Sequence, residues 1–259
     1  MDNKSEMPPI EPKEINPFSV SLVNELLGFT KNKIPPSIKD LPKTIDIKKL
    51  WLMVQNNLFA YPPGQETFIG IGVKDARLVI TGTNPGYLRT DRGSFADIVY
   101  NTKQEKRPIY LTPSVIQIDN SLIKLHTHPQ QINKSGKQTP KEFFETIPIN
   151  WWGDALALLS HPDTYVAITI DKTGPPYPVV LLIKTEQTPK KFSPQDVGKL
   201  IGEMSVAVIR TKKNKRISFS TIDQKIGEYG VGIYRGFIDH IPTQFENNPP
   251  MQLLRKRNQ

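Results

Sequence analysis

The pattern of apolar and polar residues predicts helices near the N-terminus of the chain and mostly strands beyond them. Residues 17–29, PFSVSLVNELLGF, favour a short amphipathic helix. A longer helix is expected over residues 44–59, where apolar side chains recur near helical spacing at Ile47, Leu50, Trp51, Val54 and Leu58. Prolines interrupt the segment between the two helices, because proline ends a helix and favours extended backbone before it.

Strand signals dominate the middle of the chain. Residues 66–73 and 77–83 are apolar runs with a short connection, which predicts a hairpin. Residues 164–171 and 177–187 predict a second hairpin in the same way. Residues 84–107 are polar and expected to be mostly loop. The remaining elements expected are strands over 108–119 and 120–128, and helices over 151–161, 193–209 and 220–238, although the last contains four glycines that disfavour a helix.

This order of elements predicts an α+β fold with a largely antiparallel sheet flanked by helices. Residues 1–16 are rich in Pro, Glu, Lys and Asn and are expected to be disordered. We expect an N-terminal helical extension over residues 17–59, a main domain over 60–240 and a basic C-terminal tail over 241–259. The two N-terminal helices either pack on the main domain or bind a partner.

Composition narrows the chemistry. The chain of 259 residues has no cysteine, which excludes disulfides, thiolate zinc sites, iron–sulfur clusters and cysteine nucleophiles. Any metal must therefore be held by nitrogen and oxygen. No apolar run is long enough to cross a bilayer and the N-terminus does not resemble a signal peptide, so we expect a soluble cytoplasmic protein, or a nuclear one in a eukaryote.

The net charge of +9 is concentrated in the C-terminal third. From Lys172 onward there are 15 Lys and Arg residues against 7 Asp and Glu residues. The basic clusters RTKKNKR (210–216) and RKR (255–257) suggest an acidic or nucleic-acid partner. The alternative is that they form a solvated loop and tail, and no aromatic residues interleave with the first cluster as a base-stacking surface would require.

Candidate chemistry centres on the sequence LIKLHTHP, in which two of the four histidines of the chain follow an apolar run. In a strand His126 and His128 lie on the same face, so both imidazoles can bind one metal ion. A third ligand and a carboxylate base are then required. Asp154 at the start of an apolar helix and Glu66 before an apolar strand are the candidates. The alternative is that the histidines are ordinary strand residues, Glu66 a solvated strand-entry residue and Asp154 a helix-start residue.

The combination of ETFIGIGV, LIKLHTHP and an Asp that begins a helix before TYVAITID resembles the JAMM (MPN-type) metalloprotease domain. The resemblance covers about residues 60–185 and implies a cytidine-deaminase-like sheet. It further implies that His126, His128 and Asp154 bind Zn²⁺ and that Glu66 activates the water. The implied reaction is hydrolysis of a peptide or isopeptide bond, with a protein or peptide substrate that includes ubiquitin-like conjugates.

Two departures from the family pattern leave alternatives open. The connection from His128 to Asp154 is longer than usual, and the family's serine falls on Trp151. A second alignment places Thr139 at the serine position and Glu142 as the third ligand. An inactive MPN-like scaffold and a nucleic-acid-associated binding protein are the alternative functions.

Overall fold

The described part of the chain consists of strands interleaved with helices. The structure, a computed structural model, describes residues 15–29, 31–60, 65–88, 121–128, 132–133, 136–137, 154–155, 157–171, 177–190, 195–196, 199–200, 202–203, 219–238 and 253–256. Its labelled helices are α1 (Pro17–Leu26), α2 (Lys48–Leu58) and α8 (Phe219–Glu228), with a 3-10 helix at Ile38–Asp40. Its strands are β1 (Thr44–Asp46), β2 (Gln65–Lys74), β3 (Arg77–Leu88), β4 (Ile123–His128), β5 (Ile132–Asn133), β6 (Gly136–Lys137), β7 (Val166–Asp171), β8 (Tyr177–Lys184), β9 (Val231–Ile238) and β10 (Leu253–Lys256). Residues 154–155 and 157–160 are also helical, and we refer to them as the Asp154 helix.

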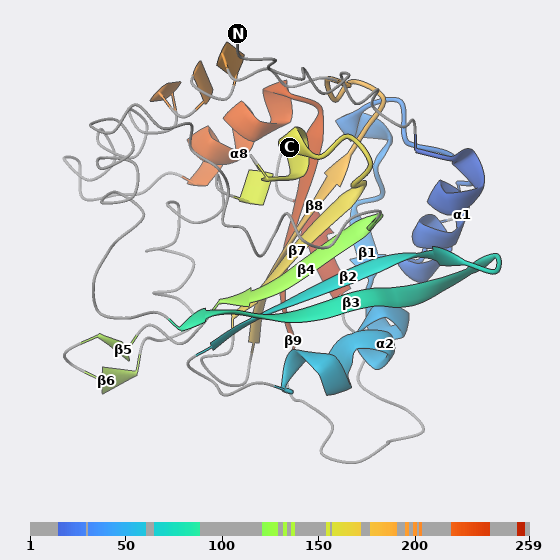
Figure 1. Cartoon of the computed structure of the whole chain (residues 1–259). Helices are drawn as coiled ribbons and strands as arrows, with labels where there is room; N and C mark the ends of the chain where they lie inside the picture. Colours follow the sequence, from blue (N-terminus) through green and yellow to red (C-terminus); the bar gives the residue numbers. More distant parts are fainter. Residues whose placement is uncertain are drawn as a thin grey trace, which may run out of the picture.

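An open mixed sheet forms the centre of the protein (Figure 1). Its six principal strands lie in the order β9-β8-β7-β4-β2-β3, and the short strands β10 and β1 continue it beyond β9. Neighbouring strands pair antiparallel except for β4 and β7, which run parallel. The Asp154 helix lies in the connection between these two strands, as a parallel crossover requires. The predicted α+β fold with a largely antiparallel sheet is confirmed.

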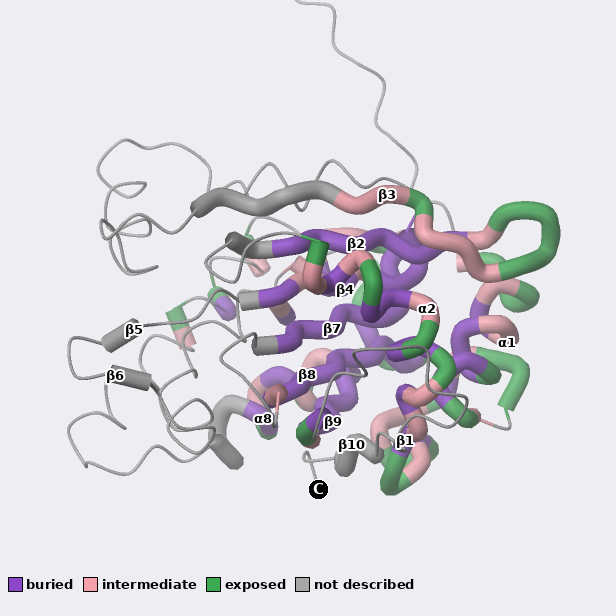
Figure 2. The backbone as a smooth tube through the Cα atoms, turned by 90° about the horizontal axis from the view of Figure 1, so that it is seen from below, coloured by how far each residue is buried: buried purple, intermediate pink, exposed green. Residues whose placement is uncertain are grey.

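The two faces of the sheet are covered by different helices. Leu125, Ile168 and Leu181 on neighbouring strands belong to a hydrophobic core that also contains the buried side chains of α1 and α2. On β9, Tyr234 belongs to that core, whereas its neighbour Arg235 bonds to α8 from the opposite face. Figure 1 shows α8 on one side of the strands and α1 and α2 on the other, and Figure 2 shows that β2, β4, β7 and β8 are mostly buried. Because both faces are covered, the sequences of β7 and β8 are nearly continuous apolar runs.

The N-terminal helices pack on the sheet. Val20 and Val23 of α1 and Trp51 of α2 are almost completely buried in the core that they share with the strands. Of the two roles that the sequence left open for these helices, the structure shows packing on the main domain. The domain boundaries remain a prediction. No helix in the described part of the chain is long and apolar enough to cross a membrane.

Three segments differ from the prediction. Thr44–Asp46 forms β1 rather than the first turn of a helix, because it pairs with the C-terminal strand β10. β3 extends to Leu88 instead of ending at residue 83, since its pairing with β2 continues to Gln65. Residues 231–238 form β9 rather than the second half of a helix. The other strands named from the sequence are confirmed, except that residues 108–119 lie outside the described residues.

Gly230 explains why the last predicted helix ends early. Its backbone has a φ of 69°, a left-handed conformation that favours glycine. Gly230 lies between the end of α8 and Val231, the first residue of β9. A Cβ atom at this position would lie 2.7 Å from the carbonyl carbon of Gln187. The carbonyl oxygen of Gly230 also accepts hydrogen bonds from the hydroxyls of Thr185 and Thr188. The turn is therefore fixed by contacts with a distant loop.

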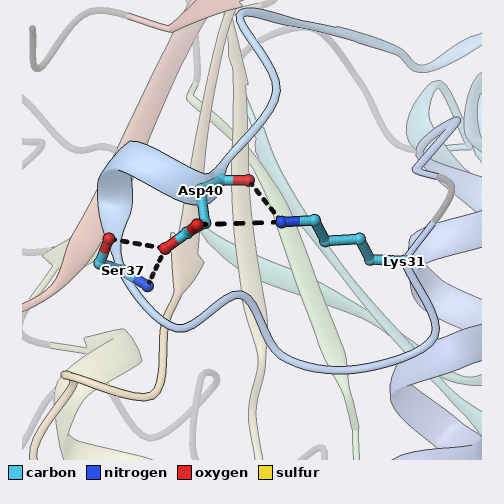
Figure 3. A network of polar contacts seen from close by, with 3 residues as sticks. All are labelled: Lys31, Ser37 and Asp40. Carbon is cyan, nitrogen blue, oxygen red and sulfur yellow. Dashed lines mark hydrogen bonds and ion pairs between the residues drawn. The ribbon is translucent and has the colours of Figure 1, made fainter.

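The proline-rich connector between α1 and α2 is held by exposed polar contacts (Figure 3). The backbone N–H and the hydroxyl of Ser37 donate to Oδ2 of Asp40 at 3.1 and 2.8 Å. The Lys31 ammonium lies 4.0 Å from Oδ1 of Asp40. Exposed ion pairs of this kind contribute little stability, so the connector depends mainly on the buried residues around it, such as Leu41.

A buried ion pair joins α8 to the sheet. Both terminal nitrogens of Arg235 donate to the carboxylate of Asp223, with Nη1 at 2.7 Å from Oδ2. Arg235 and Asp223 are 8% and 3% exposed, so both charges are largely removed from water. The attraction between the two charges therefore offsets part of the cost of burying them.

We expect Asp223→Leu or Arg235→Met alone to reduce the free energy of unfolding by about 3–5 kcal/mol, because each removes one partner of a buried ion pair. The double variant is expected to cost much less than the sum. Chemical denaturation of all four proteins measures this coupling. A double variant that costs the full sum of the two single variants would contradict the interpretation.

Candidate functional site

Strands β2, β4 and β7 bring a row of side chains together on the face opposite α1 and α2. Phe68 on β2 pairs with His126 on β4, which in turn pairs with Thr169 on β7. Directly paired residues lie on the same face of a sheet. The row lies toward the carboxyl ends of the parallel strands β4 and β7 and near the beginning of β2.

The Asp154 helix places its carboxylate over this row. Oδ1 of Asp154 lies 3.1 Å from Nε2 of His126. The two side chains are 12% and 16% exposed, so they are sheltered from bulk water without being sealed from it. Partial burial strengthens the attraction between a carboxylate and a cation, whether that cation is a protonated imidazole or a metal ion.

Two further contacts restrict how these groups move. The ring of Phe68 stacks on the His126 imidazole, with centroids 5.4 Å apart and planes inclined by 13°. The hydroxyl of Thr169 donates to Oδ2 of Asp154 at 2.6 Å. Phe68 and Thr169 are both buried, so they form a firm support beneath the polar pair.

The remaining candidate residues are placed by the backbone. The pairing of β2 with β4 ends at Phe68 and His126, so Glu66 and His128 each lie two residues beyond this pair on neighbouring strands. Glu66 also lies at a register shift between β2 and β3, an irregularity that often accompanies functional sites. The side chains of Glu66 and His128 lie outside the described part of the structure.

Buried threonines fix the pairing of β2 and β4 at this point. The backbone N–H of Thr67 donates to the hydroxyl oxygen of Thr127 at 2.9 Å, and the Thr67 hydroxyl donates to the carbonyl of Leu58 at 3.3 Å. Both threonines are completely buried. They lie between Glu66 and Phe68 on one strand and between His126 and His128 on the other, so their contact joins β2 and β4 next to the candidate residues.

His126 and Asp154 fit a zinc ion as a partial ligand set. Two ligand atoms of a tetrahedral zinc site, each about 2.0–2.1 Å from the metal, are separated by about 3.3 Å. The observed separation of 3.1 Å between Nε2 and Oδ1 is close to that value. Among the described residues no cluster of three His, Cys, Asp or Glu side chains is present. The third ligand predicted from the sequence, His128, is described only as backbone.

No protein-family model and no curated protein matches the chain. The interpretation of the site therefore depends on its geometry and on the motif in the sequence. Several residues that the sequence analysis singled out lie outside the described residues: Thr139, Glu142, Trp151 and residues 210–216.

The sequence did not identify Phe68 or Thr169 as site residues. Thr169 is the single polar residue inside the apolar run VAITI of β7. This polar residue among apolar ones was the feature of the sequence that could have identified it as a site residue. Its relation to His126 depends on a parallel pairing between strands that are distant in the sequence. Phe68 follows Glu66 by two residues, but an aromatic residue in a strand is typical of a core.

The end of the Asp154 helix is also tied to the sheet. Lys184, at the end of β8, donates from its ammonium to the carbonyl oxygen of His161 at 2.6 Å. His161 lies in the turn that follows this helix, as the sequence predicted. Burial lowers the pKa of Lys184 to about 7; Asp163 opposes this change and Lys124 adds to it.

Lys184→Met is therefore expected to stabilise the protein at pH 7 and to do so less at pH 9.5. The pKa of Lys184 is lower in the folded than in the unfolded chain, so its burial cost is largest at and below pH 7 and falls as the pH rises toward 10.5. We expect the stability difference between variant and wild type to shrink by about 2–3 kcal/mol between these two pH values. Unfolding in urea at both pH values measures it, and a pH-independent difference would contradict the lowered pKa.

Thr127→Val removes the acceptor of the Thr67 N–H without changing the shape of the side chain. We expect a loss of about 1–3 kcal/mol in unfolding free energy, because a buried donor loses its partner. The matched control is Thr44→Val, at an exposed position of the edge strand β1, where we expect a change within about 0.5 kcal/mol. Equal effects of the two substitutions would show that Thr127 does not fix the register.

Proposed function

We propose that the protein is a zinc-dependent hydrolase of peptide or isopeptide bonds. The contact between Nε2 of His126 and Oδ1 of Asp154 carries the proposal, because it joins two predicted ligands that are separated by a long connection in the sequence. The register of β2 and β4 supports it, because Glu66 and His128 each lie two residues beyond the Phe68–His126 pair on these neighbouring strands.

Each residue has a definite role in this proposal. His126, His128 and Asp154 would hold the zinc ion, which when bound lowers the pKa of a coordinated water from 15.7 toward about 7. Glu66 would accept the proton of that water and return it to the leaving amine. The partial burial of His126 and Asp154 limits the access of bulk water to the site.

The substrate class follows from the resemblance to JAMM domains. Members of that family cleave isopeptide bonds that join ubiquitin-like proteins to lysine, so a folded modifier with a flexible C-terminal tail is the first substrate to test. Unmodified peptides are the second. An inactive scaffold of the same fold is the alternative, and Trp151 at the position of the family's serine favours it.

Metal content provides the first test. We expect about one zinc per wild-type chain by elemental mass spectrometry, and loss of most of it in the His126→Ala, His128→Ala double variant, because two of the three proposed ligands are removed. His240→Ala is the matched control, since that histidine has no proposed role, and it should retain the metal. A wild-type protein that binds no zinc even after zinc addition at neutral pH would overturn the proposal.

Hydrolysis separates the enzyme from the scaffold. Zinc-loaded wild type should cleave an isopeptide-linked or peptide substrate, and Glu66→Gln should abolish cleavage while retaining the metal. Zinc binding without hydrolysis of any ubiquitin-like or peptide substrate would favour the scaffold.

A further inference from the structure

The two carboxylate oxygens of Asp154 have different partners. Oδ1 lies 3.1 Å from Nε2 of His126 on β4. Oδ2 accepts a hydrogen bond of 2.6 Å from the hydroxyl of Thr169 on β7. The two oxygens therefore have different chemical environments, although they belong to a single side chain.

The location of Thr169 makes this bond more than a surface contact. Thr169 is 2% exposed, so water cannot readily replace its partner. A buried hydroxyl without a hydrogen bond is costly, and β7 is otherwise apolar at its buried positions from Val166 to Ile170. The parallel pairing of β4 and β7 places Thr169 directly beside His126. The hydroxyl is thus held by the sheet at the level of the proposed ligand.

A hydrogen bond to one carboxylate oxygen determines how the other binds a cation. When Oδ2 is occupied by a short O–H bond, Oδ1 is the atom left to face His126 and a metal ion. Such a carboxylate binds through one oxygen, which suits a four-coordinate site, whereas a free carboxylate can also bind through both oxygens. Outer contacts of this kind orient ligands and tune metal affinity.

We propose that Thr169 is a positioning residue that restricts Asp154 to metal binding through Oδ1 alone. The inference rests on the proposed function, since it assumes that Asp154 is a zinc ligand. The simpler reading is that the bond only fixes the Asp154 helix to the sheet. That reading predicts an effect on stability but no specific effect on metal binding.

Zinc affinity of the full chain, measured by competition with a chromophoric chelator, distinguishes the two readings. Thr169→Val keeps the side-chain shape and removes the hydroxyl, and we expect it to weaken zinc binding about 10-fold to 100-fold. Thr169→Ser restores the hydroxyl and should return the affinity to within about threefold of wild type. The matched control is Thr164→Val, which removes another buried hydroxyl, the donor to the Ser121 carbonyl, and should leave zinc affinity unchanged.

Cobalt provides a second readout that a merely structural role would not change. In Co²⁺-loaded protein the visible absorption is intense for four-coordinate metal and weaker at higher coordination number. We expect Thr169→Val to lose intensity, because the freed Oδ2 joins the metal, and Thr169→Ser to keep the wild-type spectrum. If Thr169→Val does not fold by circular dichroism, Thr169→Ala takes its place.

The outcomes separate this inference from the proposed function. Wild type that binds zinc while Thr169→Val binds it equally well, with an unchanged cobalt spectrum, overturns the role of Thr169 and leaves the zinc site standing. Weakened binding in Thr164→Val equal to that in Thr169→Val overturns it too, because the loss would then follow from general destabilisation. Wild type without zinc binding overturns the proposed function and this inference together.

Discussion

Burial of the sheet on both faces is the constraint on which the rest of the structure depends. Alternate residues of β4 and β7 must suit two different environments, one packed by α1 and α2 and the other by the Asp154 helix and α8. On the first face Leu125 and Ile168 complete an apolar core. On the second face the buried side chains of Thr169 and Arg235 each form hydrogen bonds with a carboxylate, because a buried polar group without a partner is costly. The His126–Asp154 pair and the Arg235–Asp223 pair both lie on that second face.

Polar partners on the second face come from helices that cover it. Asp154 reaches the row of His126 and Thr169, and Asp223 of α8 reaches Arg235 on β9. The two pairs differ in exposure. Arg235 and Asp223 are sealed by a bidentate contact, which suits a structural role, whereas His126 and Asp154 keep some access to solvent, which a reacting group requires.

The fold brings together several residues of the proposed hydrolase. The parallel pairing of β4 and β7 requires a crossover, and that crossover contains the Asp154 helix. The same crossover includes the connection that is longer than in the JAMM pattern, so extra length there does not prevent Asp154 from reaching His126. Glu66 belongs to β2, the antiparallel neighbour of β4 on the side away from β7. Ligands and base would come from three adjacent elements.

The sequence by itself determined the types of most elements, because the alternation of apolar and polar residues is a local property. It predicted that His126 and Asp154 bind one metal ion, but it left Glu142 open as the alternative to Asp154. It did not determine that Thr44–Asp46 is a strand or that a turn at Gly230 divides residues 220–238, since both depend on contacts with distant segments. It also could not show that Phe68 and Thr169 flank His126. Only the tertiary structure decided those neighbours, because register between strands is fixed by packing of the whole sheet rather than by any single segment.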